Sequence, residues 1–255
     1  MDSDASKPNS GRIYDYLLGG HHNFEVDRAA ANQLVQMIPS IRNGMRLNRW
    51  FMDLAVQRLA AADFDCFLDL ASGLPTEGYI HELMPTAQVL YNDRDPVTVA
   101  YSRQIIGENS HVAYSQSDIA DMDTILQAAE AHFGGQRRVA VCLVGVSYFL
   151  DDAVLQRTLE ALHTWCAPGS QVAISWIAMS DPPTPRTMQM LQLYQRLGAP
   201  IQARTREKLE TFVPPWRLME PGFRTLADWN EVDSWILPED SGEEGDMYGT
   251  FLVKD

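Results

Sequence analysis

Short apolar runs alternate with amphipathic stretches from residue 64 onward, and no other feature of the chain constrains the fold as strongly. The apolar runs indicate strands at residues 66–71, 87–93, 111–118, 139–149 and 171–178. The amphipathic stretches between them predict helices at 76–84, 96–106, 122–132 and 152–166. Strands that alternate with helices are typical of a mostly parallel sheet covered on both faces. The sequence therefore predicts an α/β protein.

The two ends of the chain differ from this pattern. Residues 1–11 are polar and are expected to be a disordered lead. Residues 12–62 predict a helical cover with helices at 12–18, 26–38 and 40–62, the last with Ser40 as a plausible cap. After residue 178, helices are expected near 186–197 and 204–212, followed by late strands within 216–230 and 247–255. We expect residues 63–255 to form one structural unit with the cover.

Composition excludes several classes of function. The formal charge of −14 opposes binding to nucleic acid, because that binding depends on basic side chains. The three cysteines, Cys66, Cys142 and Cys166, lie in apolar or amphipathic stretches without ligand spacing, which predicts buried free thiols and no metal site. No apolar run reaches the roughly 18 residues that span a membrane, so a cytoplasmic protein is expected. Nothing in the sequence indicates the oligomeric state.

Acidic side chains follow three successive strands of the expected sheet, at the edge where doubly wound folds bind ligands. Asp69 closes the first strand and precedes Gly73, a residue that allows the backbone to approach a ligand. Asp93 closes the second, 24 residues later, where a carboxylate accepts hydrogen bonds from ribose hydroxyls. Asp118 closes the third and suits an adenine amine, with Ile119 beside the ring. Asp93 alone could cap the helix that opens at residue 96, and Asp118 alone could cap the next helix or simply end a strand, but together the three acids predict an adenosine site.

The loop FLDLASGLPTEG distinguishes between two nucleotide-like cofactors. A dinucleotide needs GxGxxG because its pyrophosphate lies on the helix N-terminus. The loop instead has Ala71, Gly73 and, in the first helical turn, Glu77, whose carboxylate repels a diphosphate. Pro75 suits that first turn, because it lacks the N–H that would be unpaired there. S-adenosyl-L-methionine has no phosphate and carries a sulfonium cation, so the loop favours it over NAD.

Five stretches together carry a resemblance to a known family: RIYDYLLGGHHNFEVDRAAA, RLNRWF, FLDLASGLPT, YNDRDP and VGVSYFLDD. They resemble the actinomycete-rich family of presumed S-adenosyl-L-methionine-dependent methyltransferases. The likeness covers residues 12–178, and its first stretch is the most specific because ordinary methyltransferases lack it. The resemblance implies a Rossmann-like class I methyltransferase fold with a seven-stranded sheet whose last strand is antiparallel.

The resemblance also implies cofactor roles at residues of the strand-end loops: Asp69, Ala71, Ser72, Gly73, Asp93, Arg94, Asp118, Ile119 and Gly145. Asp69, Ser72 and Gly73 would surround the methionine portion, and Gly145 would lie at the end of the fourth strand. One departure is Ala71, which stands where this fold usually has glycine. Its methyl group is expected to crowd the cofactor.

The segment YDYLLGGHHNF is the best candidate for a lid, since it precedes the sheet and bends at two glycines. It contributes Tyr14, Tyr16, His21, His22 and Asn23, although tyrosines are equally often core and such histidines are more often surface. His22 and Tyr148 are the candidates for a catalytic residue.

Arg46, one of three arginines on a helix face, and Phe149, after the fourth strand, are further candidates for contact with the acceptor. Arg46 would bind either the methionine carboxylate of the cofactor or an acidic acceptor. No general base is obvious, but alignment and exclusion of water contribute roughly 7–11 kcal/mol to such reactions, against about 10² to 10⁴ in rate from a base.

The sequence therefore predicts a methyltransferase that transfers methyl from S-adenosyl-L-methionine to a small molecule by in-line displacement. A binding protein that holds this cofactor or its demethylated product without turnover remains the alternative, and an NAD-linked oxidoreductase is disfavoured by the loop.

Overall fold

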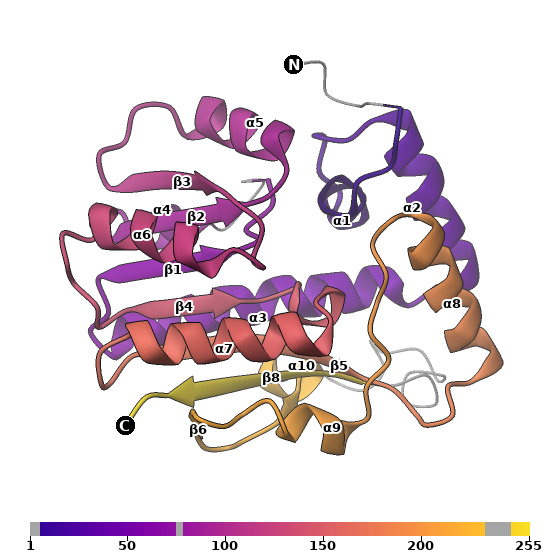
Figure 1. Cartoon of the computed structure of the whole chain (residues 1–255). Helices are drawn as coiled ribbons and strands as arrows, with labels where there is room; N and C mark the ends of the chain where they lie inside the picture. The colour runs from indigo at the N-terminus through magenta and orange to yellow at the C-terminus, as the bar shows by residue number, and fades with distance from the viewer. Residues whose placement is uncertain (1–5, 75–78, 233–245) are drawn as a thin grey trace.

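A sheet of eight strands forms the centre of the computed structural model, which describes residues 6–74, 79–232 and 246–255 (Figure 1). The strand order is β3-β2-β1-β4-β5-β8-β6, and β7 pairs with β8. The strands are β1 (Cys66–Leu70), β2 (Gln88–Asp93), β3 (Val112–Gln116), β4 (Ala140–Leu143), β5 (Gln171–Ala178), β6 (Arg217–Leu218), β7 (Arg224–Thr225) and β8 (Asp246–Val253). Strands β1 to β5 are parallel, and β8 runs antiparallel to β5.

The sheet confirms the expected mostly parallel arrangement with an antiparallel last strand, but the expected number of seven strands is wrong. The segment 216–230 does not form one strand. It forms the two-residue strands β6 and β7, both antiparallel to β8, and the short helix α10 (Leu226–Trp229). The Pro221–Gly222 pair interrupts it, with Gly222 at φ 81°, and the Thr225 side chain then caps α10 by accepting from the Asp228 N–H.

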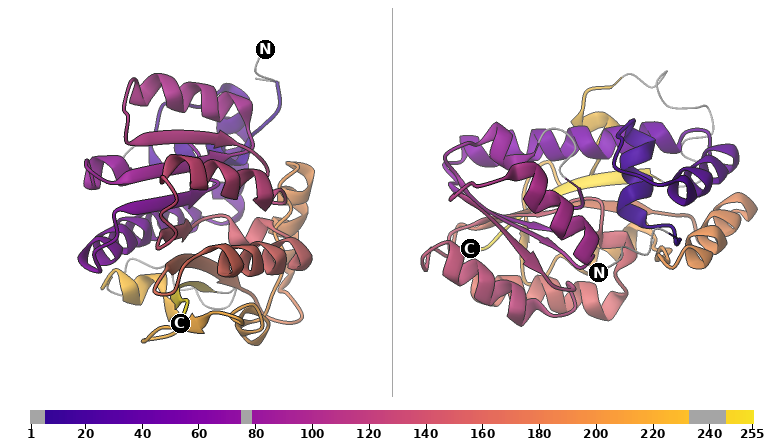
Figure 2. Two further views of the ribbon diagram at one scale, coloured as in Figure 1. Left: turned by 60° about the vertical axis from the view of Figure 1, so that its left-hand side comes forward. Right: turned by 90° about the horizontal axis from the view of Figure 1, so that it is seen from above.

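Helices cover both faces of the sheet, as Figure 2 shows from above. One face packs against α3 (Ile41–Ala61), α4 (Ile80–Leu83) and α10, and the other against α6 (Met122–His132), α7 (Asp152–Trp165) and α9 (Arg206–Glu210). Side chains alternate between these two cores, so Phe67 lies in the first and Leu68 in the second. Helix α5 (Pro96–Ile106) lies along β2 and β3.

A third core joins the N-terminal helices to a helix from far along the chain. It contains Ile13 and Leu17 of α1 (Ser10–Leu18), Leu34 of α2 (Glu25–Met37), and Leu193 and Tyr194 of α8 (Pro185–Arg196). Figure 1 shows these three helices beyond the ends toward which β1 to β3 point. The cover therefore closes the edge of the sheet at which ligands of such folds bind.

Several element boundaries differ from the expected ones for local reasons. Helix α1 begins at Ser10, two residues before the expected start, because the Asn9 side chain accepts from the N–H groups of Gly11 and Arg12. Residues 1–5 of the expected lead lie outside the described residues, as do Pro75 and Glu77. Ser40 does precede α3, but its side chain makes no capping hydrogen bond.

The fourth strand is also shorter than expected, since β4 ends at Leu143 rather than at residue 149. Gly145 adopts a left-handed conformation (φ 82°), and because a strand requires extended backbone, the strand ends before it. The 3₁₀ turn η1 (Ser147–Phe149) follows. The three cysteines are free and buried, as expected. Among the described helices, none combines the length and apolar character that crossing a membrane requires.

Candidate active site

A cavity of about 830 Å³ lies between the carboxyl ends of the parallel strands and the helical cover. Its walls come from the loops after β1, β2, β3 and β4, from α1 and α3, and from α8. All the residues that the sequence predicts to bind the cofactor line this cavity: Asp69, Ala71, Ser72, Gly73, Asp93, Arg94, Asp118, Ile119 and Gly145. The three acids that the sequence places at strand ends thus line the same cavity.

Asp69 is the most unusual group in this wall. Its side chain is buried, and in the described part of the chain no hydrogen-bond donor reaches its carboxylate. Burial raises the pKa of the Asp69 carboxyl to about 7, with Arg49 acting in the opposite direction and Asp93 adding to the rise. An unpaired buried acid in a cavity wall is suited to a cationic ligand.

Asp93 holds the first two loops together. Its Oδ2 accepts from the Gly73 N–H (3.0 Å) and its Oδ1 accepts from the Asp95 N–H (2.8 Å). Burial raises the pKa of Asp93, while these two hydrogen bonds oppose the rise. The cap of α5 is Asp95, whose side chain accepts from Thr98. The capping alternative for Asp93 is therefore wrong, and Asp93 lines the cavity.

Asp118 occupies a more open position. Its Oδ1 accepts from the Ala120 N–H (2.9 Å), and its Oδ2 lies 3.5 Å from Nη1 of Arg94. The Arg94 side chain is 69% exposed and the Asp118 side chain is 50% exposed, so this ion pair contributes little stability. Ile119 is buried beside it, and the cap of α6 is Asp121.

The turn after β1 contains two residues in the left-handed region. Gly73 has φ 68°, and a Cβ built there would meet nothing within 4 Å, so its conformation rather than crowding calls for glycine. Ala71 has φ 54° and is one of three non-glycine residues with positive φ in the described chain. A left-handed alanine is strained by roughly 1–2 kcal/mol.

We expect Ala71→Gly to stabilise the protein by about 0.5–1 kcal/mol, because glycine adopts this conformation without strain. Thermal denaturation measures the change. Ala128→Gly, in the middle of α6, is the matched control and should destabilise by about 1 kcal/mol, since glycine weakens a helix interior. A loss of stability in Ala71→Gly comparable to the control would contradict the assignment of strain.

The end of β4 meets α1 and α3 in a second part of the cavity. The Tyr14 hydroxyl donates to the Met45 carbonyl (3.1 Å) and accepts from Nδ2 of Asn48 (3.2 Å). A Cβ built on Gly145 would lie 3.1 Å from that Nδ2 and 3.9 Å from the Tyr148 hydroxyl. Tyr148 and Phe149 both line the cavity here.

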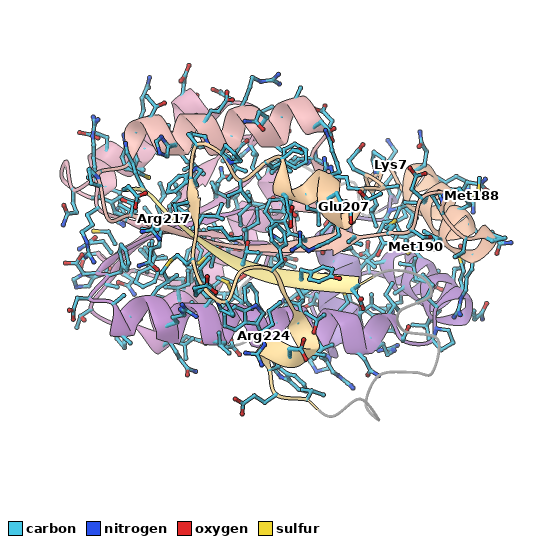
Figure 3. All side chains as sticks on the ribbon, turned by 90° about the horizontal axis from the view of Figure 1, so that it is seen from below. Lys7, Met188, Met190, Glu207, Arg217 and Arg224 are labelled. Carbon is cyan, nitrogen blue, oxygen red and sulfur yellow. The ribbon has the colours of Figure 1, made fainter. Side chains whose placement is uncertain are left out.

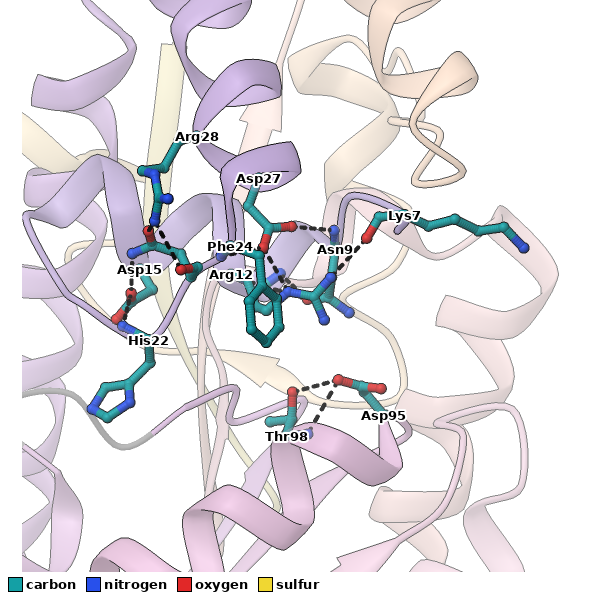
Figure 4. A network of polar contacts seen from close by, with 12 residues as sticks. Lys7, Asn9, Arg12, Asp15, His22, Phe24, Asp27, Arg28, Asp95 and Thr98 are labelled. Carbon is teal, nitrogen blue, oxygen red and sulfur yellow. Dashed lines mark hydrogen bonds and ion pairs between the residues drawn. The ribbon is translucent and has the colours of Figure 1, made fainter. Parts of the chain in front are cut away.

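The turn between α1 and α2 is built around buried acids, as Figure 4 shows. Oδ2 of Asp15 accepts from the His22 N–H (2.9 Å) and from Nδ2 of Asn23 (2.8 Å). Gly20 passes so close that a Cβ there would lie 2.1 Å from Oδ1 of Asp15. Beside it, Arg12 and Asp27 form a buried ion pair of 2.7 Å that joins α1 to α2.

The other residues expected at the lid are distributed differently. His21, His22 and Asn23 line a separate pocket of about 110 Å³ against α5, and His22 packs edge-on against Tyr101. Tyr16 points toward Asn32 and Arg42. Of the residues named as lid or acceptor candidates, only Tyr14 and Phe149 line the large cavity, while Arg46 lines neither pocket.

Helix α3 presents a different arginine to the cavity. Met45, Asn48, Arg49 and Met52 all line it, with the spacing of one helix face. Because the apolar residues Met45 and Met52 already define this face in the sequence, the helical period could have identified Arg49 in place of Arg46. Helix α8 adds Met190 and Tyr194, for which the sequence gives no comparable signal. Figure 3 shows Met190 on α8.

The described residues contain no group of three or more histidine, cysteine or acidic side chains arranged to hold a metal ion. The polar chemistry of the cavity therefore rests on aspartates, arginines, tyrosines and backbone N–H groups.

An α/β sheet with an inserted antiparallel strand, strand-end acids in one cavity and a helical cover define the class I methyltransferase type of protein. The S-adenosyl methyltransferase family model matches residues 1–251, and the chain belongs to this family. Its cofactor is S-adenosyl-L-methionine.

Two solved structures are similar to the chain over nearly its whole length. A presumed methyltransferase from Thermobifida fusca has 32% sequence identity and a TM-score of 0.85, with 98% of this chain and 96% of that chain covered. A DUF574 family protein from Streptomyces avermitilis has 27% identity and a TM-score of 0.85, with 99% of each chain covered. The comparison with curated proteins gives no match.

The residues of the cavity fit this cofactor. The Asp69 carboxyl, buried without a hydrogen-bond donor, is complementary to a cation, and a diphosphate would meet repulsion from it and from Asp93. Arg49, which forms an ion pair with Asp53 (3.4 Å) and lowers the pKa of Asp69, adds a positive charge to the same wall.

Proposed function

We propose that the protein transfers the methyl group of S-adenosyl-L-methionine to a small-molecule acceptor by in-line displacement. The observation that carries this proposal is that one cavity combines the strand-end acids with a second part lined by Tyr14, Tyr148, Phe149 and Tyr194. Pockets of this volume bury most of the surface of a small ligand. The acceptor would thus bind next to the cofactor, beneath the helical cover.

The cofactor, when bound, supplies an activated methyl carbon on a sulfonium. We assign Asp93 to its ribose hydroxyls, Asp118 and Ile119 to its adenine, and Asp69 with Arg49 to its charged methionine portion. Ser72, Gly73 and Gly145 form the backbone around it, and Arg94 lies at the rim with Asp118. These roles rest on the order of the acids along the strand ends and on the partners described above.

The charge of the cavity restricts the acceptor. Among the described residues that line it are seven aspartates, Asp15, Asp69, Asp93, Asp95, Asp118, Asp228 and Asp246, against the arginines Arg49, Arg94 and Arg186. This excess of negative charge favours the cationic cofactor and disfavours phosphorylated acceptors and nucleic acid. The acceptor is therefore neutral or cationic.

The cover supplies alignment and exclusion of water rather than a strong base. His22 lines the smaller pocket, and burial keeps the pKa of Tyr148 well above its usual value, so this phenol holds its proton at neutral pH. The acceptor would be held beneath α1, α3 and α8 with its lone pair directed at the methyl carbon. In such a displacement the lone pair of the acceptor would form the new bond to carbon, and the electron pair of the broken carbon–sulfur bond would stay on the sulfur of the cofactor.

Calorimetric titration with S-adenosyl-L-methionine, NAD and adenosine tests the cofactor part of this proposal. We expect binding of S-adenosyl-L-methionine in the micromolar range or tighter and no measurable binding of NAD, because the aspartates of the loop repel a diphosphate. Measurable affinity for NAD without affinity for S-adenosyl-L-methionine would sink the assignment. Incubation with extracts then tests turnover: S-adenosylhomocysteine must accumulate with wild-type protein and not with a variant that does not bind the cofactor.

A further inference from the structure

Two tyrosine hydroxyls in the large cavity have no described function. Tyr148, in the turn after β4, and Tyr194, on α8, both line the cavity, and their side chains are more than nine-tenths buried. In the described part of the chain, neither hydroxyl has a hydrogen-bond partner. Although the side chains are largely buried, neither hydroxyl is among the buried polar atoms without a partner, so both are open to the cavity and each O–H is free to donate to a ligand there.

The hydroxyl of Tyr14, the third tyrosine in this part of the cavity, differs from those of Tyr148 and Tyr194 because it has hydrogen-bond partners. The Tyr14 hydroxyl already donates to the Met45 carbonyl and accepts from Asn48, and nothing further is needed to satisfy it. Its O–H must donate to Met45, because a carbonyl oxygen only accepts, and this fixes the Asn48 amide with its Nδ2 toward Tyr14. The Tyr14 hydroxyl is therefore satisfied beside the two unpaired phenols, whereas Oδ1 of Asn48 is buried without a partner in the described part of the chain.

The two phenols belong to one compartment. The Tyr148 and Phe149 ring centroids are 4.7 Å apart, and those of Phe149 and Tyr194 are 6.0 Å apart. Burial raises the pKa of Tyr148, and the neighbouring Tyr14 and Tyr194 add to the rise, which places Tyr194 within electrostatic range of Tyr148. The wall around them is apolar, with contributions from Ile13, Met45, Met190 and Ile201.

The place of Tyr148 is next to the proposed cofactor site. Its hydroxyl lies 3.9 Å from where a Cβ on Gly145 would stand, and Gly145 follows the strand adjacent to β1. A ligand atom that accepts from Tyr148 would thus lie at the boundary between the two parts of the cavity. Tyr194 lies on α8, where α8 packs against α1 and α2.

We propose that Tyr148 and Tyr194 donate hydrogen bonds to a neutral oxygen of the methyl acceptor, which is a flat aromatic molecule with a carbonyl group. This proposal rests on the proposed function and adds the class of acceptor. A carbonyl oxygen has two lone pairs and can satisfy two phenol donors, and aromatic walls favour a flat apolar body. A neutral carbonyl also agrees with the negative charge of the cavity, which opposes a carboxylate there.

Acetophenone and ethylbenzene are a matched pair of probes, because both are monosubstituted benzenes with a two-carbon chain and only the former carries a carbonyl oxygen. Their dissociation constants are measured by ligand-observed NMR, with S-adenosylhomocysteine-saturated protein and again with the free protein. We expect wild-type protein to prefer acetophenone. The ratio of the two dissociation constants should fall about fivefold in Tyr148→Phe and in Tyr194→Phe, and further in the double variant.

Tyr16→Phe is the matched control, since the Tyr16 hydroxyl points to Asn32 outside the cavity. It should keep the wild-type ratio. The substitutions leave each ring in place, and thermal denaturation checks that the variants are folded. An unchanged ratio in the double variant, or no preference for the ketone in wild-type protein, would overturn the inference. Failure of S-adenosylhomocysteine to bind would instead overturn the proposed function, because the ratio in the free protein is independent of it.

Discussion

Asp93→Ala should weaken the binding of S-adenosylhomocysteine at least about 100-fold. If Asp93 binds the ribose, the variant loses two charge-assisted hydrogen bonds of roughly 1.5–3 kcal/mol each. The structure adds a second reason, because the same carboxylate accepts from the N–H groups of Gly73 and Asp95. Removing it releases both loops that surround the proposed adenosine site, so binding and local order are lost together. Isothermal titration calorimetry measures the change.

The neighbouring acid provides the control for this prediction. Asp95→Ala removes the cap of α5, at a cost of about 1 kcal/mol in stability, but keeps the N–H that donates to Asp93. We expect its affinity for S-adenosylhomocysteine to remain within a few-fold of the wild-type value. A folded Asp93→Ala protein with an equally small change would show that Asp93 does not contact the ribose.

The sheet could be predicted from the sequence because each parallel strand is a short apolar run bounded by turn residues. The helices α5 and α6 begin and end as expected, since Asp95 with Pro96, and Asp121, are strong start signals. The segment 216–230 misleads because apolar residues recur through it without a dominant period. Its structure depends on packing, with the buried Trp229 on one face of the sheet and Trp216 against the other.

The cofactor half of the site could also be predicted, whereas the acceptor half could not. The acids are expected at the strand ends from connectivity alone, and the structure places them in one cavity. Tyr194 could not be identified, because α8 shows only the apolar period of a packed helix and its contact with α1 and α2 depends on tertiary structure. His22 is a candidate because it lies in the expected lid segment, but the turn around Asp15 places it against α5.

Asp69→Asn should stabilise the free protein at pH 8 by roughly 2–4 kcal/mol, because it removes a buried negative charge. The Asp69 carboxyl has a pKa of about 7 in the folded chain, against an ordinary value of 3.8. Between these values the folded state holds a proton that the unfolded state releases. The contribution of Asp69 therefore lowers the free energy of unfolding as the pH rises from about 4 to about 7. The gain in Asp69→Asn should be largest above pH 7 and should vanish near pH 4.

The same variant should lose the pH dependence of cofactor binding. A cation beside Asp69 favours the carboxylate, so wild-type protein should release a proton on binding below pH 7, and its affinity for S-adenosyl-L-methionine should fall up to tenfold per pH unit there. Calorimetry at pH 6 in buffers with different ionisation enthalpies counts that proton. Asp65→Asn, exposed just before β1, is the control and should behave as wild type. If Asp69→Asn is less stable at pH 8 and still releases the proton, another group carries the charge that we assign to Asp69. If instead stability rises while affinity falls, the buried acid is kept at a cost to the fold because binding requires it.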